Sequence, residues 1–472
     1  MDGILTGTAV ADIELPIGMD MTGYIARTSG SKGIHDELKV RCIVFDNGTE
    51  RFALIVCDLL GLDDGFVRKT AALIERNFSI PADKIVIACT HTHSGPACIF
   101  LQDCGEKSEK VLNSLERTIA ACLAQALGRL KPSALTYRTG MCGIGKNRVV
   151  RENEESGRLR DIQVGVLTIG DADTGKVNTI LVNYACHPVV LDHTNCLYSK
   201  DYPHYMEEAL KENFGRDVNI IFANGCCGDI NPVERGSFEV MRKVGRQLSE
   251  CIVDIIYKTK TMADISFCEG QISMETIGIT IPFEYELNEK ILIELKTVYR
   301  KKAAEKTAKH MGGDEAKPWL AFMKWADNML AKVKTKTLPD GINVELKRIR
   351  IGPLAILTLP FEVFHDIGLR IKEYFGKDNT MVIGYANGVF GYLPSRSLYS
   401  SAAYETGDAY KYFGYPGPVS KDAEEIIFSA LTHFPRSCSI YCQDLYTVKF
   451  LTRYNPFGDS SGGNSGTVKI MP

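Results

Sequence analysis

The sequence lacks the features that mark several large classes of protein. No run of 18 or more apolar residues occurs in its 472 residues, so no transmembrane segment is predicted. The net charge is only −3, which does not favour nucleic acid as a partner. The opening MDGILTGTAVADIELP has no basic stretch followed by a long apolar one, so a secretory signal is not expected.

The cysteines also lack the pattern of a disulfide framework. There are 15 of them, an odd number, scattered without a repeating spacing. Small secreted domains usually show even pairing. We therefore expect a cytoplasmic protein in which most cysteines are small buried hydrophobes. For the adjacent Cys226 and Cys227, packing in a tight loop is favoured over a redox role or a second metal.

The pattern of apolar residues predicts an α/β (mixed α+β) fold of mixed β-sheets flanked by helices. A hairpin is expected over 38–60, because Asp46-Asn47-Gly48 separates two apolar runs. Helical spacing predicts helices at about 64–77, 109–127 and 238–256. Further strands are expected at 84–89, within 162–184, from 218, and within 342–360.

One catalytic domain over 1–436 is predicted, followed by a C-terminal tail over 437–472. The tail ends in GDSSGGNSG, a composition typical of partial disorder. Residues 285–335 are rich in Lys, Glu and Ala and hold both tryptophans, which indicates a helical insertion. We expect its charges to form a solvated face.

Polar side chains gather where four apolar strand-like runs end. These runs are IVIACTHTHSGP, TILVNYACHPVVL, LAILTLPFEVF and MVIGYANGVFGYLP. Sites in layered α/β proteins lie at strand ends, because rigid strands hold side chains in fixed places. A shared site is therefore expected there.

Two histidines and a glutamate at these ends can supply a metal site. His91 and His187 follow strands, and Glu362 opens the helical pattern FEVFHDIGLRIKE. Catalytic zinc commonly takes three such ligands and keeps one position for water. His93 is two residues from His91, and alternate side chains of an extended segment point to opposite sides, which favours one ligand and one neighbour. Taken singly, each histidine is also typical of a structural loop, and the glutamate of a helix N-terminus.

As a set, the motifs resemble those of the neutral/alkaline non-lysosomal ceramidase family. The resemblance spans about residues 5–435. It rests on ADIELPIGMDMTGYIAR, GIHDELKVRCIVF, THTHSGP, NYACHP, GDINP, LPFEVF and GYANGVFGYLP. It implies the fold of that family's catalytic domain, a zinc ion and hydrolysis of an amide bond.

The resemblance also implies roles for particular residues. By position in the motifs, the zinc ligands are His91, His187, Glu362 and Tyr392. His93 would assist at the substrate carbonyl. Arg148 matches the family's active-site arginine, and Tyr404 matches a tyrosine twelve residues beyond the ligand tyrosine.

Three departures from the family pattern indicate a divergent member. The loop GDINP carries Asn231 in place of the family's active-site serine, and asparagine has no hydroxyl to attack a carbonyl or relay a proton. The family's signal peptide and C-terminal β-sandwich domain are not expected here. The helical insertion is expected to change the mouth of the pocket. These departures leave the expected zinc site unchanged, but they weaken the expectation that ceramide is the substrate.

The expected reaction is attack of a zinc-activated water on an amide (N-acyl) bond of a lipid or a smaller polar substrate. Zinc and His93 would stabilise the oxyanion, Tyr404 and Arg148 would orient the substrate, and Asn231 would donate a hydrogen bond to it. Two alternatives stay open. One is a zinc hydrolase of another bond class, such as a glycosidase or esterase, and the other is a non-catalytic binding protein. The sequence does not indicate an oligomeric state.

Overall fold

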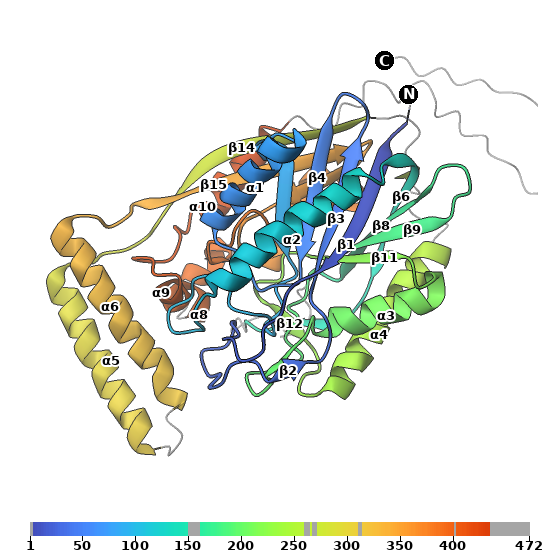
Figure 1. Ribbon diagram of the computed structural model, residues 1–472. Helices are drawn as coiled ribbons and strands as arrows, with labels where there is room; N and C mark the ends of the chain where they lie inside the picture. The colour runs from blue at the N-terminus through green and yellow to red at the C-terminus, as the bar shows by residue number, and fades with distance from the viewer. Residues whose placement is uncertain are drawn as a thin grey trace, which may run out of the picture. The chain divides into compact units, whose positions relative to one another are not determined.

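Two β-sheets lie face to face, and helices cover the outer face of each (Figure 1). The structure is a computed structural model that describes residues 3–149, 161–258, 265–266, 271–309, 314–400 and 403–434. The predicted fold class, mixed sheets flanked by helices, is confirmed.

Among the residues that the structure describes, the larger sheet has nine strands, in the order β11-β9-β8-β6-β1-β3-β4-β5, with β13 beside β6. The pairs β4·β5 and β9·β11 are parallel, and the other pairs are antiparallel. The predicted strands all fall within it or its partner sheet. Its strands are β1 (Leu5–Asp12), β3 (Lys39–Asp46), β4 (Arg51–Cys57), β5 (Ile85–Cys89), β6 (Lys131–Met141), β8 (Gln163–Asp171), β9 (Val177–Tyr184), β11 (Asn219–Asn224) and β13 (Ile265–Ser266).

The smaller sheet has the order β14-β15-β16-β18, and its last pair is parallel. Three short strand pairs, β2·β10, β7·β12 and β17·β19, lie outside both sheets. The strands are β14 (Ile272–Pro282), β15 (Gly341–Ile351), β16 (Leu354–Thr358), β18 (Thr380–Ile383), β2 (Gly33–Ile34), β10 (Leu197–Tyr198), β7 (Gly145–Asn147), β12 (Ile230–Pro232), β17 (Glu362–Val363) and β19 (Tyr392–Leu393).

Alternation along the strands explains the layering. In β3, Val40 and Val44 pack under the outer helices, whereas Ile43 and Phe45 pack against the smaller sheet. Both faces are buried, so the strand reads as a continuous apolar run. Helices α1 (Asp64–Phe78), α2 (Glu109–Leu127), α3 (Tyr202–Phe214) and α4 (Phe238–Lys258) cover the larger sheet. The smaller sheet is covered by α7 (His365–Phe375) and α10 (Ala423–Thr432).

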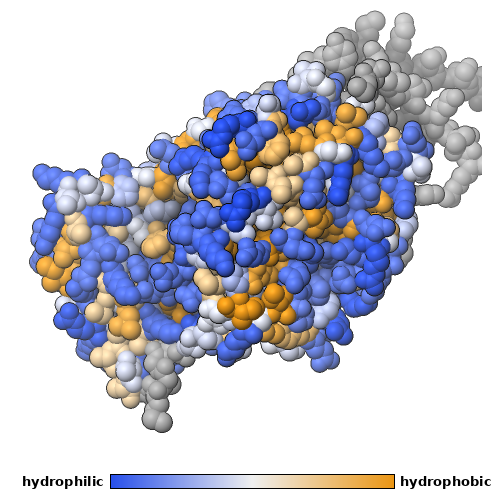
Figure 2. All heavy atoms as spheres, viewed as in Figure 1, coloured by the Kyte–Doolittle hydropathy of each residue, from blue (hydrophilic) through white to orange (hydrophobic). Residues whose placement is uncertain are grey.

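The expected helical insertion is a hairpin of α5 (Glu289–Lys309) and α6 (Lys317–Thr335) that projects from one end of the sheets (Figure 1). Its inner side is apolar, and the indole N–H of Trp325 donates to the carbonyl of Tyr415 at 2.7 Å. The side chain of Lys301 is 80% exposed. Figure 2 shows a mainly hydrophilic surface over the hairpin, as expected of a solvated face.

One local prediction is wrong. Glu362 does not open a helix: it lies in β17, parallel to Tyr392, and α7 begins at His365. The Glu362 N–H donates to the carbonyl of Gly391 at 2.9 Å, so this segment is extended and paired instead of helical.

The described residues test some of the remaining expectations but not others. No helix among the described residues has the length and apolarity that crossing a membrane requires. Every cysteine of the described residues is a free thiol, and most are buried, as expected. The predicted tail at 437–472 lies outside the described residues. The domain boundary and the cytoplasmic location stay predictions.

Candidate metal centre

The strand ends named by the sequence meet at one place. Hydrogen bonds between backbone groups tie the ends of strands from both sheets together. Gly225 N–H donates to Tyr184 (2.9 Å), Gly384 N–H to Asn224 (3.0 Å), and Cys89 N–H to Tyr385 (3.0 Å). The loops that follow β5, β9, β11, β16 and β18 are thereby held side by side.

His91 and His93 face the same space, although they are two residues apart. Strand β5 ends at Cys89, and His91 has φ +68°, a left-handed conformation that L-residues rarely adopt. This turn ends the extended segment before His93, so the alternation of an extended chain does not apply and the His93 side chain reaches the same space as His91. The Nε2 atoms of the two rings are 3.3 Å apart.

Each of the three site histidines has its Nδ1 atom against a backbone carbonyl. A carbonyl only accepts, so Nδ1 carries the proton and Nε2 presents a lone pair to the shared space. The Nδ1 to oxygen distances are 2.7 Å for His91 to Leu60, 3.0 Å for His93 to Gly23, and 3.1 Å for His187 to Ile230.

Glu362 completes the group from the smaller sheet's side. Its Oε2 is 3.2 Å from Nε2 of His91 and 3.3 Å from Nε2 of His187. A tetrahedral zinc site with bonds of about 2.0–2.1 Å places neighbouring ligand atoms about 3.3 Å apart. The observed separations match that value, so the donor set fits a divalent ion of this kind. His91, His93 and His187 alone also satisfy the spacing of a metal-binding group.

Burial and mutual proximity set the ionisation of these groups. Burial lowers the pKa of His93 and of His187, and the neighbouring His91 adds to the effect in both. Burial alone would raise the pKa of Glu362, but His91 and His187 outweigh it and hold that pKa well below its usual value. Neutral imidazoles beside an ionised carboxylate are the forms that bind a metal ion.

Tyr392 and Arg148 lie beside this group. A guanidinium nitrogen of Arg148 donates to the Tyr392 hydroxyl at 3.2 Å, to the carbonyl of Gly228 at 2.7 Å, and pairs with Glu405 at 2.9 Å. Burial would lower the pKa of Arg148, but Tyr392 and Glu405 outweigh it and raise that pKa. A fixed positive charge therefore stands against the oxygen of Tyr392.

A cavity of about 280 Å³ opens onto the group, and we call it the histidine cavity. Its polar lining includes His91, His93, Glu362, Tyr392 and Tyr404, and its apolar lining includes Ile25, Leu60, Leu101 and Phe413. Tyr404 begins α8 (Tyr404–Gly407) and is 44% exposed. Tyr412, the last residue of α9 (Ala409–Tyr412), lines the cavity and packs on Phe322 of the hairpin. The hairpin thus supports one wall of the cavity, and the expectation that it changes the mouth of the pocket stays a prediction.

Asn231 lies apart from the lining. It is in β12, paired with Lys146 of β7, directly after the Ile230 carbonyl that holds His187. It is not among the described residues that line the histidine cavity. Arg148 is likewise behind the lining and reaches the site through Tyr392.

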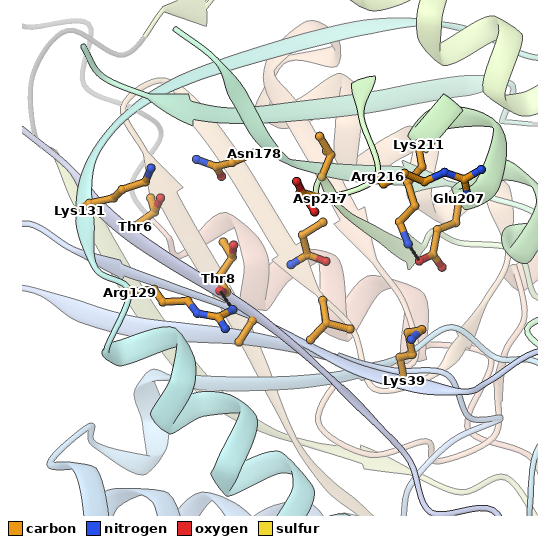
Figure 3. A pocket seen from close by; sticks show the side chains of 14 residues that line it. Thr6, Thr8, Lys39, Arg129, Lys131, Asn178, Glu207, Lys211, Arg216 and Asp217 are labelled. Atoms are coloured by element: carbon orange, nitrogen blue, oxygen red, sulfur yellow. Dashed lines mark hydrogen bonds and ion pairs between the residues drawn. The ribbon is translucent and has the colours of Figure 1, made fainter. Parts of the chain in front are cut away.

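A larger groove of about 650 Å³ lies elsewhere, beside β1 and β11 (Figure 3). Its cations already have acidic or carbonyl partners: Lys211 donates to Glu207 at 2.6 Å, and Lys131 to Asp171 at 3.0 Å. Its described lining contains no histidine or cysteine. The chemistry therefore points to the smaller histidine cavity.

Sequence reasoning missed two supports of the site. The ring of Tyr385 stacks on His91 with 4.0 Å between centroids, and its hydroxyl lies 3.0 Å from the thiol of Cys227. Asp229 accepts hydrogen bonds from the backbone and the ring of His365 at 2.9 and 2.6 Å. Both lie inside motifs that the sequence singled out, but nothing in the spacing marked them.

Comparison with known proteins identifies the family of the chain. The sequence profile of the neutral/alkaline non-lysosomal ceramidase N-terminal domain matches residues 4–278, more than half of the chain. The chain belongs to this family. A neutral ceramidase of Pseudomonas aeruginosa is 22% identical over 461 residues, which cover 82% of this chain and 66% of that protein.

Solved ceramidase structures share the fold. A crystal structure of neutral ceramidase from Pseudomonas aeruginosa has a TM-score of 0.68 at 19% identity, covering 91% of this chain and 74% of that one. A structure described as ceramidase complexed with C2 has the same TM-score and identity, covering 95% of this chain and 78% of that one. The chain spans slightly less than two thirds of the length of the Pseudomonas aeruginosa neutral ceramidase that it matches in sequence.

Proposed function

We propose that this ceramidase-family chain is a zinc-dependent hydrolase that cleaves the amide bond of an N-acyl substrate. The observation that carries the proposal is the spacing of the donor atoms. Nitrogen and oxygen lone pairs from His91, His187 and Glu362 face one another at 3.2–3.3 Å, which only a cation or protons can compensate.

The residues that would hold the ion are His91, His187, Glu362 and Tyr392. When bound, zinc supplies a Lewis acid that polarises a carbonyl and makes water reactive near neutral pH. The carbonyls of Leu60 and Ile230 fix the ring orientations of the two histidine ligands. Arg148 fixes the hydroxyl of Tyr392 from behind.

His93 and Tyr404 are the groups proposed to act on the substrate. Nδ1 of His93 is held by the Gly23 carbonyl, so we assign its Nε2 the role of accepting a proton from the attacking water molecule in place of the expected contact with the oxyanion. We propose that the hydroxyl of Tyr404, which lines the histidine cavity and is partly exposed, donates to the substrate carbonyl. The hydrogen-bond role of Asn231 stays a prediction.

The cavity indicates what kind of amide fits. Part of its wall is apolar, which suits an alkyl chain, but its volume of about 280 Å³ lies just below that of typical small-molecule pockets, about 300–1,000 Å³. We propose a ceramide-like N-acyl amide of which only the part around the scissile bond is enclosed. The names of the relatives, neutral ceramidase and ceramidase complexed with C2, support this class.

The first test concerns the metal and the bond together. His187→Ala should lose most of its zinc, measured by elemental analysis, and its hydrolysis of a short-chain N-acyl amide should fall to background. His433→Ala, which changes an exposed histidine after α10, is the matched control and should keep both. Equal zinc in wild type and His187→Ala would remove this residue from the site. A panel of amide, ester and glycoside substrates separates the three bond classes.

A further inference from the structure

A second group of potential ligands lies apart from the histidine cavity. His35 and Asp36 follow β2, and His204 lies in the first turn of α3. One ligand atom from each lies within 4.8 Å of the others, and this group shares no residue with that around His91. We propose that these three residues form a second metal site, for a divalent transition-metal ion such as Zn²⁺.

The distances are close to those of a coordination sphere. Oδ2 of Asp36 is 2.8 Å from Nδ1 of His35, and its Oδ1 is 3.8 Å from Nδ1 of His204. Ligand atoms of a tetrahedral zinc site are about 3.3 Å apart, so binding requires one of these distances to lengthen and the other to shorten, each by about 0.5 Å. The side chains of His35 and His204 are 20% and 19% exposed, which leaves a side open for water as a fourth ligand.

One buried nitrogen of this group lacks a partner. Within the part of the chain that the structure describes, Nδ1 of His204 is buried and has no hydrogen-bond partner. Nδ1 of His35 is hydrogen-bonded to Oδ2 of Asp36 at 2.8 Å, so a metal ion at this site would replace the proton of that bond. Imidazole nitrogens with carboxylate oxygen suit zinc and related ions.

The surroundings hold the ligands in place. The ring of His35 stacks on Phe238 with 4.3 Å between centroids. The Ser199 hydroxyl and the Lys200 N–H donate to Asp36 at 2.6 and 2.9 Å, which orients its carboxylate. The ammonium group of Lys200 is 2.6 Å from Glu207, so its charge is balanced.

The second site connects to the loop that carries His91 and His93. The hydroxyl of Thr92, which lies between them, donates to the carbonyl of Ser199 at 2.7 Å. The Ser199 hydroxyl in turn donates to Asp36. An ion at this site would therefore fasten the segment after β2 to the start of α3, directly behind the catalytic loop, and would stabilise both.

Zinc titration of the metal-free, full-length chain tests the proposal. Calorimetry should show two Zn²⁺ ions per chain for wild type. His204→Ala should lose one ion, or bind it at least tenfold more weakly, while keeping the ion bound by His187. Asp36→Asn, which keeps the shape of the side chain and removes its charge, should behave in the same way. His433→Ala should keep both ions.

The experiment can disprove the second site without disproving the proposed function. If His187→Ala lowers the stoichiometry and His204→Ala does not, the second site is wrong and the proposed function stands. If only one ion binds to wild type and His204→Ala leaves it unchanged, the second site is also wrong. Circular dichroism of each variant confirms that it is folded, and Co²⁺ absorption gives an independent count of imidazole-bound ions.

Discussion

The two histidines of THTHSGP occupy one loop but have different surroundings. His91 touches Glu362 and stacks under Tyr385, whereas His93 is held by the Gly23 carbonyl and the ring of Tyr24 at 4.9 Å. The separation of their Nε2 atoms, 3.3 Å, would allow His93 as a ligand as well. Only substitution distinguishes a ligand from a group that acts beside the metal.

We predict that His91→Ala loses both zinc and activity, while His93→Ala keeps most of its zinc. Turnover of His93→Ala should fall by roughly 10²–10⁴, the range for losing a positioned acid–base or oxyanion group. Zinc content, melting temperature and turnover on one preparation of each variant make the comparison. If His93→Ala loses zinc as completely as His91→Ala, the proposed division of roles is wrong.

Gly23 gives a sharper test of how His93 is positioned. Its φ is +105°, and a Cβ atom there would lie 2.6 Å from Nδ1 of His93. Gly23→Ala should displace the ring and lower turnover at least tenfold with zinc still bound. Gly18→Ala is the matched control, because Gly18 has φ +90° but open space around the added atom. Both variants should lose about 1–3 kcal/mol of stability through backbone strain. Equal turnover in the two would show that the contact with His93 is unimportant.

At the scale of elements, Asp229 joins three pieces of the chain. Its carboxylate accepts from the backbone and ring of His365 at the start of α7 and from Asn147 of β7. Its carbonyl accepts from the N–H of Arg148. Asp229 thus fixes the loop before β12, Arg148 and α7 relative to one another. These hydrogen bonds of Asp229 help to fix the relative positions of the segments that carry the candidate ligands.

This tie predicts a pH dependence of stability. Burial would lower the pKa of His365, but its hydrogen bond and ion pair with Asp229 outweigh burial and raise that pKa. The stabilisation is therefore complete below the unfolded pKa of about 6.5 and is lost as pH rises through the folded value. His365→Gln should cost roughly 1.5–3 kcal/mol at pH 6, the range for a hydrogen bond to a charged group, and less at pH 9. Urea unfolding at both pH values measures this, and an equal loss at both would contradict it.

At the scale of the whole described unit, the metal centre joins both sheets. His91 and His187 follow strands of the larger sheet, and Glu362 follows a strand of the smaller one. An ion there would add a link between parts that already meet through packing and hydrogen bonds, such as that from the Asn183 side chain to the Val382 carbonyl. It would also compensate buried lone pairs that face one another.

Removal of the metal should therefore lower the melting temperature of the chain. An ion present at about 100 times its dissociation constant stabilises the folded state by about 2.7 kcal/mol. Chelator should abolish this gain, and zinc should restore it. The melting temperature with and without chelator should be measured in the His204→Ala variant, because this substitution removes any contribution of the second site. His187→Ala in that background should show no chelator effect, and a melting temperature that chelator leaves unchanged in wild type would count against the centre.

Local patterns in the sequence were enough to predict most of the helices and strands of the two sheets. The Asp46-Asn47-Gly48 turn, the apolar spacing in α1, α2 and α4, and the buried runs of β5 and β9 follow from propensity and periodicity, which act over a few residues. The motifs also indicated which polar residues gather at strand ends. Family resemblance added Tyr392, Arg148 and Tyr404, which spacing alone could not single out.

Only the tertiary structure decided how these residues meet. The left-handed backbone at His91, the pairing of Glu362 with Tyr392 in place of a helix start, and the stacking of Tyr385 depend on contacts between segments far apart in the chain. The second cluster has the same origin, because strands β3 to β10 lie between His35 and His204 in the chain. Periodicity reports which face of an element is buried, whereas a site depends on distances between elements, and those are set by packing the whole chain at once.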